Sequence, residues 1–129
     1  VDWGKPYHKT KIYSGFKQWC NALEPGMRVV DVKLAGPHAS GISSPGVKAS
    51  GFRSKDGKKL VVHVVNLWDQ PAPIRLDLST APWASARIHS IRTSGTDDCK
   101  EGPIRPYSTE KGVAETLKPR EMVSYIFTR

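Results

Sequence analysis

Apolar residues recur at helical spacing in the first third of the chain. Their separations of four, three, one and three positions place them on one face of a helix. Pro25 and Gly26 follow, and proline cannot continue a helix while glycine turns the chain. We predict one helix over about residues 12 to 23, with Trp19 in the core. The apolar stripe consists of Ile12, Phe16, Trp19, Cys20 and Leu23.

After this turn the period changes to two, which is typical of half-buried strands. Alternating runs lie at residues 27–34, 47–53, 58–66, 74–78, 86–91 and 122–127. The sequence Ser-Lys-Asp-Gly at 54–57 predicts a hairpin between the second and third runs. Residues 60–65 are apolar on both faces except at His63, so we expect a central strand that is covered on both sides.

These runs predict an all-β fold, an antiparallel β-sandwich of about seven to nine strands with one N-terminal helix packed outside it. We expect residues 1–26 to form an N-terminal segment that carries the helix, and residues 27–129 to form the sandwich domain. Residues 36–46 and 93–109 lack periodicity and are predicted loops. The predicted core contains Val30, Val32, Val47, Leu60, Val62, Val64, Ile74, Leu76, Ile88, Val123 and Tyr125.

The charge of the chain favours polyanionic partners. Twenty Lys and Arg against twelve Asp and Glu give a net charge of +8. The basic residues are dispersed, however, and form no run of five. A solvated basic surface is therefore favoured over a basic polyanion-binding domain, and binding of nucleic acid is not expected. No apolar run reaches the length that a membrane-spanning helix needs.

Cys20 and Cys99 are the two cysteines. Their spacing matches no zinc motif, so we expect no metal site. They are candidates for one disulfide, and the alternative is a pair of reduced cysteines.

Motifs for nucleotide binding, acyl hydrolysis and metalloprotease activity are absent, so we expect no catalytic residue and no cofactor. Glycoside hydrolysis needs two facing carboxyl groups. The acidic residues fall instead on the polar faces of strands and in turns. His63 has no nucleophile motif beside it, which indicates a buried neutral histidine with one hydrogen bond.

Two tryptophans beside turns could stack on sugar rings. We name Trp68 and Trp83, with Asp69, Gln70 and Arg87 as hydrogen-bonding neighbours, as candidate carbohydrate-binding residues. Packing of both rings over the end of the sandwich is the favoured alternative.

Several short motifs, taken in order, resemble those of glycoside hydrolase family 30 enzymes. YSGFKQW at 13–19 and LEPGMRV at 23–29 are similar to the last barrel helix of that family and to the turn that leads into its C-terminal side β-domain. VKASGF at 47–52, the run 60–66 and LKPREMVSY at 117–125 resemble strands of that domain in the same order. The resemblance covers nearly the whole chain.

This resemblance implies a non-catalytic accessory domain of a secreted, extracellular enzyme that degrades polysaccharides. The family's catalytic glutamates lie on barrel strands that would precede residue 1, so none carries over. The implied partners are a catalytic (β/α)8 barrel and a plant or fungal cell-wall polysaccharide such as glucuronoxylan, β-1,6-galactan or β-1,6-glucan. For such an accessory domain we expect Trp68 and Trp83 to be packed, and the exposed apolar patch to be the helix face around Phe16 and Trp19, which the barrel would cover. The alternative is an independent carbohydrate-binding module or lectin.

Overall fold

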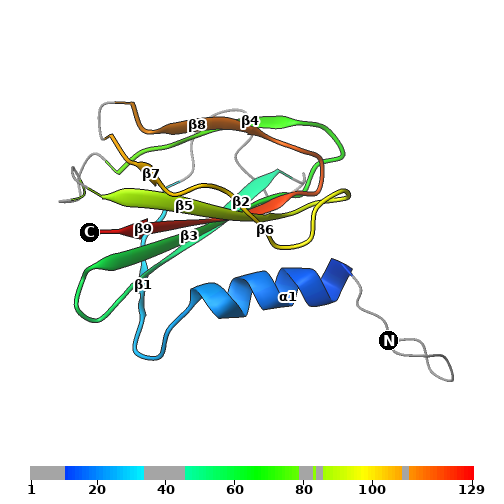
Figure 1. Cartoon of the computed structure of the whole chain (residues 1–129). Helices are drawn as coiled ribbons and strands as arrows, with labels where there is room; N and C mark the ends of the chain where they lie inside the picture. Colours follow the sequence, from blue (N-terminus) through cyan, green and yellow to red (C-terminus); the bar gives the residue numbers. More distant parts are fainter. Residues whose placement is uncertain (1–10, 34–45, 79–82, 84–85, 109–110) are drawn as a thin grey trace, which may run out of the picture.

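The computed structural model describes residues 11–33, 46–78, 83, 86–108 and 111–129. Figure 1 shows three layers, which are a helix, a large sheet and a small sheet. The elements are α1 (Lys11–Ala22), β1 (Arg28–Val30), β2 (Val47–Arg53), β3 (Lys59–Asn66), β4 (Ala72–Leu76), β5 (Arg87–Thr93), β6 (Lys100–Glu101), β7 (Arg105–Pro106), β8 (Val113–Leu117) and β9 (Met122–Thr128).

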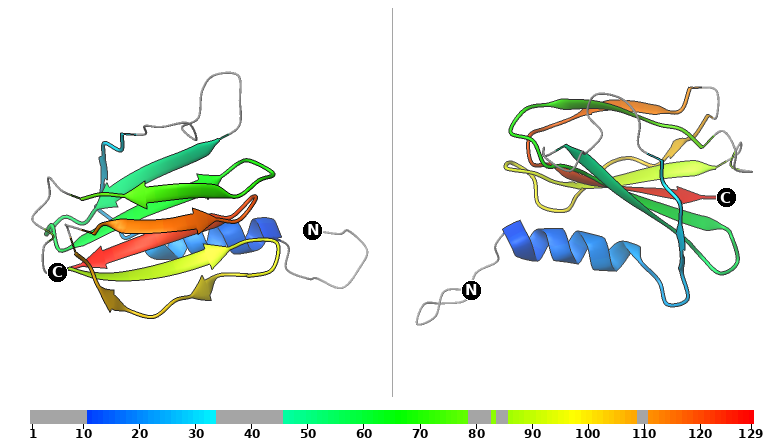
Figure 2. Two further views of the ribbon diagram at one scale, coloured as in Figure 1. Left: turned by 90° about the horizontal axis from the view of Figure 1, so that it is seen from above. Right: turned by 180° about the vertical axis from the view of Figure 1, so that it is seen from behind.

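The large sheet has the strand order β1-β2-β3-β9-β5-β6, and β7 also pairs with β5. The small sheet consists of β4 and β8, and the strand pairs in both sheets are antiparallel. Figure 2 shows α1 lying across the outer face of the large sheet, on the side away from β4 and β8. The predicted all-β sandwich with one N-terminal helix is therefore confirmed.

Strand β3 lies between β2 and β9, as its apolar sequence predicts. Successive side chains of a strand point to opposite faces. Leu60, Val62 and Val64 therefore face the small sheet and belong to the core, whereas Val61 and His63 are buried on the face that α1 covers. Both faces of this strand are closed.

The β2–β3 connection contains the predicted Asp-Gly turn. Gly57 has a φ of 72°, a left-handed conformation that glycine adopts without strain. The Asp56 carboxylate accepts hydrogen bonds from the Lys58 backbone N–H (3.0 Å) and the Ser54 hydroxyl (2.7 Å), and these bonds lower the pKa of Asp56. The turn thus fixes the register of the hairpin.

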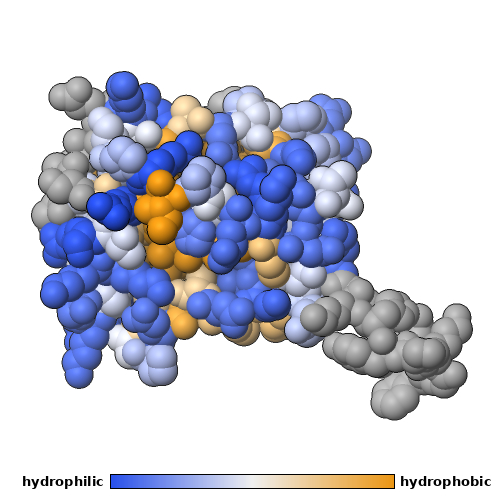
Figure 3. All heavy atoms as spheres, viewed as in Figure 1, coloured by the Kyte–Doolittle hydropathy of each residue, from blue (hydrophilic) through white to orange (hydrophobic). Residues whose placement is uncertain are grey.

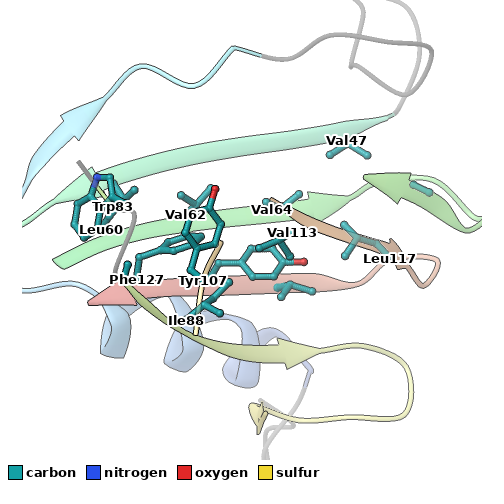
Figure 4. Close-up of a cluster of buried hydrophobic side chains, with 14 residues drawn as sticks. Val47, Leu60, Val62, Val64, Trp83, Ile88, Tyr107, Val113, Leu117 and Phe127 are labelled. Carbon is teal, nitrogen blue, oxygen red and sulfur yellow. The ribbon is translucent and has the colours of Figure 1, made fainter. Parts of the chain in front are cut away.

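The core lies between the two sheets (Figure 4). Seven of the predicted core residues are buried, and Val30, Ile74 and Leu76 are partly buried against them. Val32 is half-buried outside strand β1. Trp83 is buried, as the favoured alternative of packing over the end of the sandwich predicts. Tyr107, which lies in a predicted loop, is also buried in the core. The buried cluster consists of Val47, Leu60, Val62, Val64, Ala72, Trp83, Ala86, Ile88, Tyr107, Val113, Leu117, Val123, Tyr125 and Phe127.

Three expectations differ from the structure. Helix α1 begins and ends one residue earlier than predicted, and the first strand is three residues long because pairing with β2 ends at Val30. The predicted loop at 93–109 contains β6 and β7, two-residue strands at the edge of the sheet that are too short to show a period. Most of the predicted loop at 36–46 lies outside the described residues.

Candidate functional site: the helix and its outer face

Helix α1 packs on the large sheet through its polar side. Its buried residues are Ser14, Gln18 and Ala22, which recur every four positions and so form one face. Gln18 is 2% exposed, and its Nε2 lies 2.9 Å from both the Ile91 carbonyl oxygen and Ser124 Oγ. Its Oε1 accepts a hydrogen bond of 2.7 Å from the Thr93 hydroxyl. One glutamine therefore ties the helix to β5 and β9.

His63 lies beneath the same helix. Its Nδ1 is 2.7 Å from Ser124 Oγ, and its ring stacks on Trp19 with centroids 4.0 Å apart. Burial lowers the pKa of His63 to about 4, so the ring is neutral at pH 7. Nε2 has no hydrogen-bond partner among the described residues. The expected buried neutral histidine with one hydrogen bond is confirmed.

The outer side of α1 carries its large apolar residues. Ile12 is 74% exposed and Phe16 is 69% exposed, and Tyr13 lies beside them on the same face. We call these three residues the apolar helix face. Trp19 turns partly inward, where it is half-buried between His63 and the edge of the Phe52 ring. The apolar stripe of the sequence therefore points mostly away from the core of this chain.

The helix is held at both ends by ion pairs. Lys11 pairs with Asp98 at 2.7 Å, and Glu24 pairs with Lys59 at 2.9 Å. The bond from Lys11 also lowers the pKa of Asp98. These contacts fix the direction in which the apolar helix face points.

The two cysteines are free thiols in this structure, Cys20 exposed and Cys99 half-buried. Cys99 Sγ donates to the Ser14 carbonyl oxygen at 3.1 Å. Cys20 lies six residues further along the helix, about 9 Å along its axis. This arrangement favours the reduced alternative over the candidate disulfide.

The candidate carbohydrate-binding residues do not form one site. Trp83 is 3% exposed and closes the end of the core beneath the Arg129 guanidinium, which lies 5.0 Å from the ring centroid. Trp68 is half-buried where β3 ends, and its carbonyl oxygen accepts from the Arg120 N–H. Asp69 and Gln70 are exposed beside it.

Arg87 is exposed at the other end of the large sheet. It pairs with Thr128 at the end of β9, whereas the Trp68 loop lies near the start of β9 at Met122. The six residue-to-residue steps from Met122 to Thr128 span about 20 Å of extended strand. Arg87 therefore cannot share one sugar ring with Trp68.

Two of the described glutamates lie against the same arginine. Glu115 and Glu121 approach a common residue, Arg92, at 3.0 and 3.7 Å. The Tyr125 hydroxyl donates to Glu115 at 2.5 Å, and burial together with Glu115 raises the pKa of Tyr125. Arg92 thus pairs with both carboxylates and links β5 of the large sheet to β8 of the small one.

Within the described ranges no group of three or more His, Cys, Asp or Glu is placed to hold a metal ion. None of the helices in those ranges has the length and apolar character that a membrane span requires.

The fold of this chain is similar to part of several solved structures. No protein-family model and no curated protein sequence matches the chain. A family 30 subfamily 8 xylanase from Clostridium acetobutylicum matches 92% of this chain with 13% identity and a TM-score of 0.72. A family 30 endoxylanase from Clostridium papyrosolvens C71 matches the same share with 13% identity and a TM-score of 0.71. A conserved exported protein from Bacteroides fragilis matches 92% with 17% identity and a TM-score of 0.70.

The chain spans only part of each of these proteins. It covers 28% of either xylanase and 22% of the exported protein. The match bears out the resemblance to the side β-domain of family 30 enzymes, with its preceding helix, at the level of the fold.

Sequence reasoning missed the polar network under the helix. Gln18, Thr93 and Ser124 carry it, and none stands out in an apolar pattern. A signal was present, because Ser14, Gln18 and Ala22 form a stripe of small and polar residues opposite the apolar one.

Proposed function

We propose that this chain is a non-catalytic accessory domain of a secreted glycoside hydrolase, and that the apolar helix face packs against the enzyme's catalytic (β/α)8 barrel. Residues 1–26 would form the connection to that barrel, and residues 27–129 the accessory sandwich. The chain matches only 28% of each xylanase, so about 70% of either enzyme lies outside the matched domain. This partial match supports the proposal.

The exposure of Ile12 and Phe16 is the observation that carries the proposal. An amphipathic helix on a one-domain protein usually turns its apolar side inward. Here the inward side is already filled by Gln18 and its hydrogen-bond partners. The outer side therefore remains available for a second apolar surface, and exposed apolar patches of this kind mark interaction sites.

The alternative of an independent carbohydrate-binding module receives less support. The buried Trp83 ring offers no free face to a sugar, and the half-buried Trp68 stands about 20 Å along the sheet from Arg87. A module that relies on these two rings together would need a different arrangement.

Association with a barrel tests the proposal. The chain would be titrated by calorimetry into the barrel portion of the C. acetobutylicum xylanase, as wild type and as Phe16→Ser. We expect binding that the substitution weakens by about tenfold, because a large apolar side chain leaves the interface. Ile104→Ser is the matched control, since Ile104 is 66% exposed on another part of the surface. Equal binding by Phe16→Ser and wild type would contradict the proposed docking face.

A further inference from the structure

An open groove of about 360 Å³ lies at the edge of the large sheet, away from the helix. Arg87, Ile104, Arg105 and Pro106 line it. Strands β5 and β7 pair in this region, with Arg87 opposite Pro106 and Ile88 opposite Arg105. Arg87 and Arg105 are therefore diagonal neighbours across the two strands. Successive side chains alternate between the two faces of a strand, so Arg87 and Pro106 leave one face of this pair and Arg105 leaves the other. Both arginines border the groove at this edge of the sheet.

Neither guanidinium group that lines the groove has a partner among the described residues. Arg87 and Arg105 are exposed, and neither forms an ion pair or a hydrogen bond with any residue in the described ranges. Arg92 and Arg129 differ: Arg92 pairs with Glu115, and Arg129 donates to the Gly57 carbonyl oxygen. Within the described part of the chain, the donors of Arg87 and Arg105 are therefore left for a ligand.

The other two described residues that line the groove are aliphatic. Ile104 is 66% exposed, and Pro106 lies next to it. Figure 3 shows a hydrophobic group of atoms surrounded by hydrophilic ones on the face over β5 and β7. An aliphatic wall flanked by charged donors combines apolar area with directional hydrogen bonds, which is how ligand sites fix orientation.

We propose that this groove binds an acidic polysaccharide. Arg87 and Arg105 would form charge-assisted hydrogen bonds with the carboxylates of its uronic acid units, and Ile104 would contact the C–H face of a sugar ring. The planar guanidinium matches a carboxylate through two parallel hydrogen bonds. Nucleic acid fits the groove less well, because none of the described residues that line it is an aromatic platform for a base. The inference goes beyond the proposed function, since the groove needs no contact with the barrel.

Titration of the 129-residue chain with oligogalacturonate tests the groove. We expect Arg87→Ala and Arg105→Ala each to weaken binding by about tenfold or more, since each removes charge-assisted hydrogen bonds. Ile104→Ser should weaken it by about threefold. Arg28→Ala is the matched control, because Arg28 is an exposed arginine on β1, the strand at the opposite edge of the sheet. Its binding should stay within about twofold of wild type.

Three results would overturn the proposal. The first is no binding of oligogalacturonate at 50 mM salt, and the second is equal weakening by Arg28→Ala and Arg87→Ala, which would indicate diffuse surface charge. The third is tighter binding of duplex DNA than of the oligouronate. Phe16→Ser should leave oligouronate binding unchanged, so failure of the groove and failure of the helix docking face are distinguishable.

Discussion

Gln18 holds the helix to the sheet through hydrogen bonds that a buried amide must keep satisfied. We expect Gln18→Leu to lower the free energy of unfolding by about 2 to 3 kcal/mol, because the Thr93 and Ser124 hydroxyls and the Ile91 carbonyl would lose their shared partner. Urea unfolding measures this loss. Lys17→Leu, an exposed change on the neighbouring position, is the control and should alter stability by less than about 0.5 kcal/mol. Equal effects of the two substitutions would contradict the network.

His63 makes the stability of the domain depend on pH. Its folded pKa of about 4 lies below the unfolded value of 6.5, so the unfolded state binds the extra proton as the pH falls. Stability is fully present above pH 6.5 and is lost as the pH falls toward 4, by about 3 kcal/mol in total. The ring partners of His63, Trp19 and Phe52, and its hydrogen-bond partner Ser124 are all uncharged.

Thermal unfolding between pH 7 and pH 5 measures this dependence. His63→Gln keeps a polar group near Ser124 without a titrating ring, so its unfolding temperature should vary less over that range. A variant with the same pH dependence as wild type would assign the effect to other groups.

At the scale of elements, β1 lies very close to β2 at a glycine. A Cβ built on Gly51 would lie 2.6 Å from Val30 Cγ2, so β1 must shift if the residue is larger. We expect Gly51→Ala to destabilise the chain by about 1 to 3 kcal/mol through overpacking. Val30→Ala should recover part of this loss in the double variant, a coupling that denaturant unfolding of the four proteins measures. Strict additivity would mean that the two residues do not collide.

Strands were predictable from the sequence where local turn geometry and alternation of apolar residues determine them. Residues 47–53 and 58–66 alternate around an Asp-Gly turn, and local geometry alone makes them a hairpin. The two-residue strands β6 and β7 were not predictable, since pairing with β5 creates them and Lys100, Glu101, Arg105 and Pro106 carry no period.

The exposure of the helix face around Phe16 was predicted from the resemblance, which implies a barrel over that face, and not from the apolar pattern. An apolar stripe taken alone normally indicates the inner face. Ile12 and Phe16 point outward because Gln18 fills the contact with the sheet, and the pattern does not show that contact. The groove was missed for a similar reason: Arg87 was a candidate, but its neighbour Arg105 comes from a strand that the sequence does not reveal.

At the scale of the whole molecule, the chain should hydrolyse no glycoside. Glu115 and Glu121 both lie against Arg92, and Tyr125 donates to Glu115, so internal partners already occupy these two carboxylates. Incubation with xylan, galactan and glucan should therefore release no reducing sugar above the buffer blank. Turnover that disappears on Glu115→Gln or Glu121→Gln would contradict this prediction.

The orientation of the domain in a larger enzyme depends on which surface is covered. The apolar helix face and the groove at Arg87 lie on different elements, α1 and the β5–β7 edge. A barrel on the helix would thus leave the groove open to solvent, so the two proposed roles are compatible.

Hydrogen exchange of the chain, alone and mixed with the xylanase barrel, tests the central claim most directly. Amides that become buried or stabilised in a complex exchange more slowly. We predict added protection in peptides that cover residues 11–23, and none in peptides that cover β4, β8 or the groove residues 104–106. Protection confined to β4 and β8, or no change anywhere at saturating barrel, would contradict the claim that the helix is the docking face.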